Sequence, residues 1–503
     1  MKAESGTDLR AAARDAAASV LARARGASVC VAALALAAYP ANGAVGDSLW
    51  KFFADFSVTT IAPIPDLSGN GGTDLLVGSQ DDSLYAVEGR GAGAGRQLWA
   101  YAFKSTLSAA AALPDLNGDG TPDAAGGDES GMIAALGGAD GKMLWRYLSG
   151  TGSVLALAAL PDVNGDGTAD LAAGSEVDTV FCLSGKPGGT RVLWTFGLPA
   201  GRPHGPPIDP PKPLAKAAAG PPSDRPSGAN SLALLENKGK APFGLAVGAN
   251  NDTVYCLALS DGTVKWKTGL PGDAWKAAAF PDATGDGVDE VLVACGADAG
   301  YLLNGATGAA LWSHKVSLGA VTVAAVPDMD GDGKPDALIG DGNGAIHCVS
   351  GIASGDAPAA WMYAIGDAST VLSLASPGDL DGDGRAECLA GTSGDSLILI
   401  GGKGGKRMGG VGLGGQVPAL AAADFDGNGT LDWAAASELG FAQAFSGGGT
   451  VSILHPLRAD AGRAPADPSR FRARILFHSP AGLRDARGRL FPSAPGGFRP
   501  TYR

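Results

Sequence analysis

Short apolar segments separated by polar turns recur along the chain from about residue 45 to about residue 450. They come in groups of four, as in LALAALP, DLAAGS, TVFCLSG and RVLWTF between residues 155 and 196. Apolar runs of this length, bounded by Gly, Asp and Asn, are typical of β-strands. Four such runs joined by short turns predict a four-stranded antiparallel sheet. The first run of each group is rich in Ala, as expected of strands that crowd around a central axis.

The groups repeat with a period in the forties. An acidic nonapeptide between the first and second runs starts at residues 66, 115, 162, 282, 328, 379 and 424, and one interval of 120 residues breaks the series. A period of this size is the signature of a repeat architecture. The long interval contains one further group, in which Glu236, Lys238, Lys240 and Gly244 occupy the positions that are acidic or polar elsewhere. The chain is therefore predicted to be all-β, an eight-bladed β-propeller of four-stranded antiparallel blades, with seven blades as the alternative.

The two ends of the repeat region are predicted to meet. The last group lacks a fourth run, whereas Ser48 to Phe52 resembles a fourth run that precedes the first complete group. Pairing of this strand with the last group would close the ring and remove its exposed edges. A Trp ends most of the fourth runs, and we expect these side chains to pack between blades.

Each acidic nonapeptide carries oxygen side chains at positions 1, 3, 5 and 9 and glycines between them. Alternating oxygen ligands on a tight turn are what Ca²⁺ requires of a short loop. The predicted ligands are Asp66, Ser68, Asn70, Asp74, Asp115, Asn117, Asp119, Asp123, Asp162, Asn164, Asp166, Asp170, Asp282, Thr284, Asp286, Glu290, Asp328, Asp330, Asp332, Asp336, Asp379, Asp381, Asp383, Glu387, Asp424, Asp426, Asn428 and Asp432. The backbone carbonyl of position 7, where the residue varies freely, is expected to complete each set.

These loops differ from EF-hand loops, which need a bidentate Glu at position 12. Position 12 here is apolar or Gly in all seven copies, so the ligand set must close at position 9. We expect about seven structural Ca²⁺ ions and none in the hairpin that begins at Glu236. The loop that starts at Asp66 has the fewest acids and should bind most weakly, whereas those that start at Asp328 and Asp379 should bind most tightly.

Charge and composition restrict the partners and the compartment. The net charge is −13, and the acids are concentrated in the loops, so nucleic acid is not an expected partner. Residues 1–44 contain Arg23 and Arg25 followed by a short apolar run and small residues, which is typical of a secretory signal peptide. We therefore expect a secreted, extracellular or periplasmic protein, with no membrane-spanning segment once the signal is removed.

Two segments stand outside the repeats. Residues 197–228 are Pro-rich and are expected to form an extended insertion in the propeller region 45–457. Residues 458–503 are rich in Arg and Pro and are expected to be a disordered tail, or else an anchor to an acidic surface. Five cysteines that follow the signal region lie in strand-like runs, so they are expected to be buried hydrophobic residues without disulfides.

The nonapeptides and the runs around them resemble the FG-GAP/VCBS repeats of integrin α-subunit propellers and bacterial surface proteins. Endings such as Gly141 to Trp145 also resemble the quinoprotein-type (PQQ-like) repeat. The resemblance covers roughly residues 50–450 and implies calcium as a structural ion.

A binding module is the main functional hypothesis. The loops are expected at one end of the propeller, and the turns between second and third strands at the other end, where a protein or glycan ligand would bind. The candidate contacts at that end are Trp275, Asp81, Asp82, Asp128, Asp252 and Asp341. Interblade packing for Trp275 and solvated turns for the acids are the alternatives. An enzyme, either a quinoprotein dehydrogenase or a polysaccharide-active propeller, and a purely structural scaffold are the other hypotheses; no catalytic residues are predicted.

Overall fold

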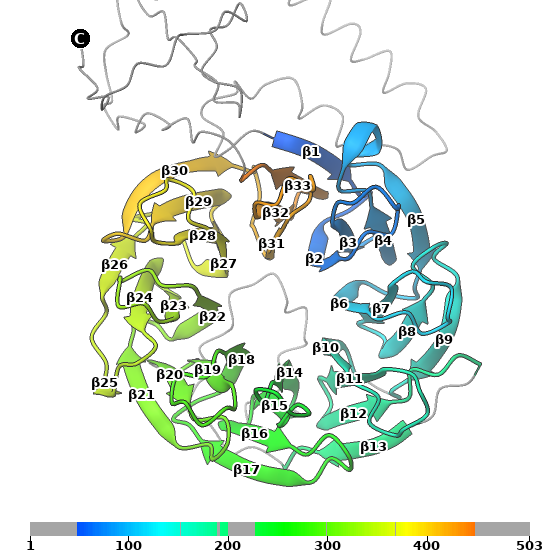
Figure 1. Ribbon diagram of the computed structural model, residues 1–503, viewed down its shortest axis with the longest axis horizontal. Helices are drawn as coiled ribbons and strands as arrows, with labels where there is room; N and C mark the ends of the chain where they lie inside the picture. The colour runs from blue at the N-terminus through cyan, green and yellow to red at the C-terminus, as the bar shows by residue number, and fades with distance from the viewer. Residues whose placement is uncertain are drawn as a thin grey trace, which may run out of the picture. The chain divides into compact units, whose positions relative to one another are not determined.

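The computed structural model describes residues 48–150, 152–188, 192–199, 227–297, 299–367 and 369–447 of the chain. These residues form eight antiparallel sheets arranged as blades around a central axis (Figure 1). The result confirms the predicted all-β, eight-bladed propeller and excludes the seven-bladed alternative. The blades lie within the expected region 45–457, whereas the expected signal segment 1–44, the tail 458–503 and most of the insertion 197–228 lie outside the described residues.

Each blade has four strands, numbered here from the axis outward (Figure 1). The first strands of blades 1 to 8 are β2 (Val58–Ile64), β6 (Leu107–Leu113), β10 (Val154–Leu160), β14 (Ala229–Leu235), β18 (Ala274–Phe280), β22 (Ala320–Val326), β27 (Val371–Gly378) and β31 (Leu420–Ala423). The second strands are β3 (Asp74–Ser79), β7 (Asp123–Asp128), β11 (Asp170–Ser175), β15 (Gly244–Ala249), β19 (Glu290–Cys295), β23 (Asp336–Asp341), β28 (Glu387–Thr392) and β32 (Asp432–Ser437). The third strands are β4 (Ser83–Val87), β8 (Met132–Leu136), β12 (Thr179–Leu183), β16 (Thr253–Leu257), β20 (Ala299–Leu303), β24 (Ala345–Ser350), β29 (Ser396–Gly401) and β33 (Phe441–Phe445). The fourth strands are β5 (Gln97–Ala102), β9 (Met143–Leu148), β13 (Val192–Gly197), β17 (Val264–Gly269), β21 (Ala310–Lys315), β26 (Trp361–Ala364), β30 (Lys406–Gly412) and β1 (Ser48–Phe53).

Blade 8 closes the ring as predicted. Its fourth strand is β1, which pairs antiparallel with β33 although the two lie at opposite ends of the described chain (Figure 1). The partners run from Ser48 opposite Phe445 to Phe53 opposite Phe441. Because β1 fills the place that β30 fills in blade 7, no inner strand of blade 8 is left as an open edge.

The second strands are buried along their whole length, because each lies between two neighbouring blades. Glycines permit this close approach: a Cβ added to Gly127 would lie 2.5 Å from a methyl carbon of Val154 in the next blade. At the axis, hydroxyls tie neighbouring first strands together. The Ser108 Oγ donates to the Val154 carbonyl at 2.6 Å, and the Ser373 Oγ donates to the Val417 carbonyl at 2.9 Å.

The tryptophans of the fourth strands pack between blades, as predicted. In five of them the indole N–H donates to a carbonyl in the turn after the third strand of the next blade. These pairs are Trp50 with Gly89, Trp99 with Gly138, Trp145 with Gly185, Trp194 with Leu259, and Trp266 with Gly305, at 2.6–2.9 Å. The indole therefore fastens each of these blades to the next in both an apolar and a polar way.

Three smaller features complete the description. The five described cysteines are buried and form no disulfide, as expected. Burial raises the pKa of Cys182 and Cys256 to about 12. A short strand, β25 (Gly355–Asp356), pairs in parallel with the outer edge of β21, and η2 (Gly91–Gly93) is a single 3₁₀ turn. Within the described ranges, no helix has the length and apolar character that a membrane crossing requires.

Candidate metal-binding loops

The acidic nonapeptides connect the first and second strands of every blade except blade 4, so all seven lie at the same end of the propeller. We call this the loop end. Position 9 is in each case the first residue of the second strand. The glycines at positions 4 and 6 adopt positive φ angles, for example 75° at Gly382 and 88° at Gly384. Glycine is required there because other residues rarely adopt this conformation.

The position 1 carboxylate organises the loop from inside. In the loop of blade 7, Asp379 accepts hydrogen bonds from the backbone N–H groups of Gly382 at 2.8 Å and Gly384 at 2.9 Å, one on each oxygen. The same arrangement recurs in blade 2, where hydrogen bonds from Gly120 and Gly118 hold the pKa of Asp115 below its ordinary value. The backbone of the loop therefore holds the position 1 carboxylate in place.

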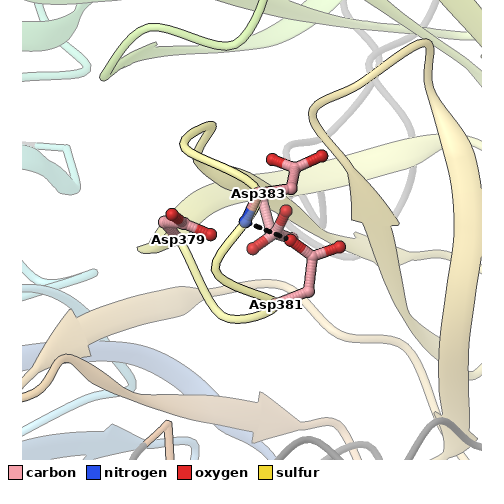
Figure 2. Close-up of side chains that lie close together, drawn as sticks. Asp379, Asp381 and Asp383 are labelled. Atoms are coloured by element: carbon pink, nitrogen blue, oxygen red, sulfur yellow. Dashed lines mark hydrogen bonds between the residues drawn. The ribbon is translucent and has the colours of Figure 1, made fainter. Parts of the chain in front are cut away.

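Four of the loops bring three or four of the carboxylates at positions 1, 3, 5 and 9 together. Ligand oxygens lie within 4.8 Å of one another in four loops: those of Asp379, Asp381, Asp383 and Glu387; of Asp282, Asp286 and Glu290; of Asp328, Asp330 and Asp332; and of Asp424, Asp426 and Asp432. Figure 2 shows the blade 7 loop curled so that its three aspartates face one another, with the Asp383 N–H donating to Asp381 at 3.0 Å. In the other three acidic loops, Ser68, Asn117 and Asn164 stand at position 3, and a neutral oxygen replaces the carboxylate.

The position 9 carboxylate is buried, and one of its oxygens always accepts the N–H of position 2. The bond measures 2.7 Å from Leu67 to Asp74 and 2.7 Å from Met329 to Asp336. Burial raises the pKa of every position 9 acid. It reaches about 6 at Asp336 and about 7 at Glu387, where neighbouring carboxylates of the same loop add to the effect of burial.

The second oxygen of position 9 divides the loops into two classes. In Asp74, Asp123, Asp170 and Asp432 it accepts the N–H of Gly89, Gly138, Gly185 and Gly447, which follow the third strand. In Glu290, Asp336 and Glu387 the second oxygen is buried and makes no hydrogen bond of ordinary geometry with the described residues, although the Gly402 N–H lowers the pKa of Glu387 against the larger effect of burial. These three side chains are at most 1% exposed. A buried carboxylate oxygen without a donor is costly when it is ionised, because nothing replaces the hydrogen bonds that it makes in water. The described residues provide no such partner of ordinary geometry for this oxygen in blades 5, 6 and 7.

Sequence reasoning missed one further polar contact of these loops. In four of them the position 5 side chain faces the residue 18 places further on, at the end of the third strand. Asp286 accepts from Asn304 Nδ2 at 2.7 Å, and Asp332 accepts from Ser350 Oγ at 2.8 Å. In blade 3 Asp166 accepts from Ser184 Oγ at 3.2 Å, and in blade 1 Asn70 Nδ2 donates to Glu88 at 3.2 Å. Blades 2 and 7 have Gly137 and Gly401 at this spacing, so the polar residue is a signal that only some of the repeats contain.

Blade 4 has the same strands without the acids. Leu235 pairs with Gly244 in the register in which Leu160 pairs with Asp170 in blade 3. Lys238 and Lys240 are exposed, and the ammonium that reaches this hairpin is that of Lys265, which donates to the Phe243 carbonyl at 2.5 Å. The hairpin therefore forms without acids at positions 3, 5 and 9, with a lysine from the fourth strand among its contacts.

The candidate ligand contacts at the opposite end have mainly structural roles. Asp128 and Asp341 are buried and accept backbone N–H bonds from Met132 and Ala345. Their burial argues against the prediction that these two side chains contact a ligand. Asp81 accepts from the Asp55 N–H at 3.0 Å and from the Tyr85 hydroxyl at 2.9 Å. These carboxylates hold the turns in shape.

Three candidates remain partly exposed at that end. Asp82 and Asp252 occupy left-handed turn positions, with φ angles of 64° and 59°. Trp275 is half-buried, and its indole lies against Gly296 in the turn of its own blade, where an added Cβ would come within 2.7 Å of the ring. Trp275 thus has a contact within its own blade.

Comparison with known proteins agrees with this geometry. The FG-GAP-like repeat family matches residues 66–126 and 328–390, each of which begins at a position 1 aspartate and ends in a second strand. No curated protein matches the sequence significantly.

Solved structures with the same architecture share little sequence with this chain. Sqt1 of Saccharomyces cerevisiae is 14% identical with a TM-score of 0.62, over 80% of this chain and 99% of that one. BamB of Moraxella catarrhalis is 16% identical with a TM-score of 0.52, over 80% and 97%. The computationally designed Ika8 protein is 14% identical with a TM-score of 0.50, over 80% and 99%. At this identity the similarity concerns the fold alone, and together with the matched segments it identifies the chain as an eight-bladed β-propeller that carries FG-GAP-like repeats.

Proposed function

We propose that the protein is a calcium-stabilised binding module whose seven acidic loops each hold a divalent cation. The observation that carries the proposal is the convergence of three or more carboxylates within 4.8 Å in four of these loops. Such carboxylates repel one another at neutral pH unless a cation lies among them. An all-oxygen donor set on a flexible loop suits Ca²⁺ better than Zn²⁺ or Cu²⁺, which prefer nitrogen and sulfur ligands.

The buried oxygens without partners support the fit. In Glu290, Asp336 and Glu387, position 9 offers an oxygen that no described donor satisfies. A bound cation would supply the missing positive partner and keep these acids ionised despite their burial. Positions 1, 3, 5 and 9 would hold the ion, and its role would be to lock the hairpin at the start of each second strand.

Blade 4 argues that the acids are not needed for folding of the hairpin itself. The register of β14 and β15 is the same as in acidic blades, although Gly244 replaces the position 9 acid. The seven other blades keep four oxygen side chains at positions 1, 3, 5 and 9, and cation binding would account for all of them.

The proposed location is the cell surface or an extracellular or periplasmic compartment, where millimolar calcium could fill sites of about 10⁻⁴–10⁻³ M affinity. The proposed ligand is an extracellular protein or glycan, and the partly exposed Trp275, Asp82 and Asp252 are its candidate contacts. The proposal is of a non-enzymatic module, because each cluster of acids lies within the hairpin of a single blade and the clusters do not combine into one central site.

Titration calorimetry of the full-length chain with CaCl₂ tests the metal part of the proposal. We expect heat of binding with sub-millimolar to millimolar affinity, and a much weaker response to MgCl₂. A panel of glycans and extracellular proteins should then be screened against the immobilised chain in calcium and in chelator. The expected result is a ligand retained in calcium and weakened by Trp275→Ala; absence of any heat with CaCl₂ would remove the basis of the proposal.

A further inference from the structure

Two hydrogen bonds join the loops of blades 6 and 7 directly. The Ala386 N–H, at position 8 of the blade 7 loop, donates to the carbonyl of Asp328, at position 1 of the blade 6 loop, at 3.2 Å. The guanidinium of Arg385, at position 7 of the blade 7 loop, donates from Nη1 to the Met329 carbonyl at 3.2 Å. Two consecutive residues of the blade 7 loop therefore donate hydrogen bonds to the first two residues of the blade 6 loop.

Arg385 lies directly against the blade 6 loop. A Cβ added to Gly331 would come within 1.9 Å of its guanidinium, so the position 4 glycine leaves just enough room for this side chain. Half-burial and contact with backbone on two sides fix the arginine in one orientation. Among the described residues, its hydrogen bond is to the loop backbone and not to a carboxylate. Arg385 therefore supports the conformation of the blade 6 loop in addition to placing a positive charge beside it.

A continuous path of hydrogen bonds connects the two candidate sites. Asp383, a predicted ligand of the blade 7 loop, accepts the Arg385 N–H at 3.0 Å. Arg385 binds the Met329 carbonyl, and the Met329 N–H donates to Asp336 at 2.7 Å. Asp336 is the buried position 9 acid whose other oxygen has no partner among the described residues. At one end of this path is Asp383 and at the other end is Asp336, and both are predicted cation ligands.

We propose that cation binding in the loop 379–387 favours cation binding in the loop 328–336, and that Arg385 carries this positive coupling. The inference rests on the proposed function, since it concerns the occupancy of the same sites. A cation held by Asp383 would fix the Arg385 backbone and, through its side chain and Ala386, the start of the blade 6 loop. The loop 328–336 is then already partly ordered when its own cation binds, so it loses less conformational entropy on binding.

The coupling is confined to particular neighbours. The equivalent backbone bond joins Thr73 of blade 1 to Asp424 of blade 8 at 3.0 Å, whereas in blade 5 Asp289 donates to Glu236 of the blade 4 hairpin, where no cation is expected. Blades 2 and 6 have Pro122 and Pro335 at position 8, which have no N–H to donate. Within the described chain, blade 3 shows no such bond from its loop to that of blade 2. The loops of blades 2 and 3 are therefore a natural control pair.

Hydrogen exchange read by mass spectrometry can follow each loop of the full-length chain separately. The peptide that covers residues 327–337 reports the calcium concentration at which the blade 6 loop becomes protected. Removal of the blade 7 site by Asp379→Asn with Asp381→Asn is expected to raise this midpoint about fivefold. Arg385→Met alone should raise it by a similar factor, and the two changes together should raise it no further, because both break the same path.

Charge and contact make opposite predictions for Arg385, which makes the test decisive. If Arg385 acted as a nearby positive charge alone, its removal would lower the midpoint, as Lys334→Met at position 7 of the blade 6 loop is expected to do. Arg385→Lys keeps the charge but cannot make the same planar contact, so we expect it to raise the midpoint. Melting temperatures in chelator that are no lower than that of the parent would show that all the variants fold normally.

The outcomes separate the two proposals. Protection of both loops by calcium with unchanged blade 6 midpoints in the blade 7 variants would overturn the coupling and leave the calcium sites intact. The same holds if Arg385→Met lowers the midpoint. Absence of calcium-dependent protection in every loop would overturn the calcium sites and the coupling with them. In the control pair, Asp162→Asn with Asp166→Asn should leave the midpoint of residues 114–124 unchanged.

Discussion

The hairpins of blades 4 and 7 have the same place in the fold and opposite chemistry. In blade 7 the loop between the first two strands brings together Asp379, Asp381, Asp383 and Glu387. In blade 4 the corresponding positions hold Glu236, Lys238, Lys240 and Gly244, and Lys265 donates to the backbone of the hairpin. Both hairpins nevertheless lead from a first strand into a second strand that is buried along its length.

The comparison shows that blade packing alone does not demand the acids. Apolar side chains of the strands and the tryptophans between blades hold the ring together in both cases. The acids add an electrostatic cost that the apolar core must absorb unless a cation offsets it. The proposed function thus gives one molecule a metal-dependent blade and a metal-independent blade, and each can be altered without the other.

Chelation should have the largest effect. A site filled at a hundred times its dissociation constant contributes about 2.7 kcal/mol to the free energy of unfolding, and several sites act together here. We expect the melting temperature to fall by about 10 °C or more when calcium is replaced by excess chelator. Differential scanning calorimetry of the full-length chain provides the measurement. Equal melting curves in both buffers would erase the distinction between the acidic blades and blade 4.

A change at position 5 should separate the two hairpins directly. Asp383→Ala in blade 7 is expected to remove about 2–3 kcal/mol of the calcium-dependent stabilisation, because one site loses a ligand. Lys240→Ala, at the same position of blade 4, is the matched control and should leave the calcium-dependent part unchanged. Chemical denaturation in calcium and in chelator gives both values. A similar loss in the two variants would mean that the acids act through the fold in general.

The effect of Glu387→Gln on the free energy of unfolding should depend on pH, and at pH 8 calcium should reverse the sign of this effect. Burial raises the pKa of Glu387 to about 7, so the metal-free folded state holds a proton that the unfolded chain has released. Its contribution therefore lowers the free energy of unfolding as pH rises from about 4.5 to about 7. In chelator, Glu387→Gln should be more stable than the parent by about 2 kcal/mol at pH 8 and equal to it near pH 5.

In excess calcium the same variant should be less stable than the parent at pH 8, because the ionised carboxylate is then a ligand. Thermal melting at both pH values, with and without calcium, gives the four comparisons needed. Gly244 offers no ionisable group in blade 4, so a change there provides no such reversal. An effect of Glu387→Gln with the same sign in calcium and in chelator would contradict a cation contact at this residue.

The smallest effect is expected at the residue that supports position 5. Ser350 Oγ donates to Asp332 at 2.8 Å, whereas the corresponding residue of blade 4 is Ala258. Ser350→Ala makes the blade 6 site resemble blade 4 in this one respect. Loss of a hydrogen bond of about 1 kcal/mol should weaken calcium binding by the blade 6 loop about fivefold. Calcium-dependent hydrogen exchange of that loop measures the change, with Ser184→Ala in blade 3 as its counterpart.

The repeating part of the structure could be predicted from sequence because it is written in local patterns. The apolar runs located the four strands of each blade, the interval of 120 residues revealed blade 4, and the unpaired run at Ser48 to Phe52 predicted the closure with β33. The position 1 acids and the glycines between them marked the loops correctly, since turn geometry depends on residues close in sequence.

Features that depend on contacts between distant residues could not be predicted in this way. The two states of the position 9 acid differ by whether a glycine after the third strand reaches it, as Gly89 reaches Asp74 but no donor satisfies the second oxygen of Asp336. The same two blades that leave Asp336 and Glu387 without this donor also leave the incoming indoles of Trp312 and Trp361 without an acceptor. Likewise, the apparent exposure of Asp128 and Asp341 in turn-like sequence concealed their burial in the folded chain.

Counting the bound cations tests the central idea most directly. The full-length chain should be dialysed to equilibrium against millimolar calcium, and its calcium content should be measured by elemental analysis. The account predicts about seven ions per chain, about six in a variant whose blade 7 acids are replaced by the blade 4 residues, and an unchanged number when Lys238 and Lys240 are replaced. A chain that binds no calcium at millimolar supply would contradict it.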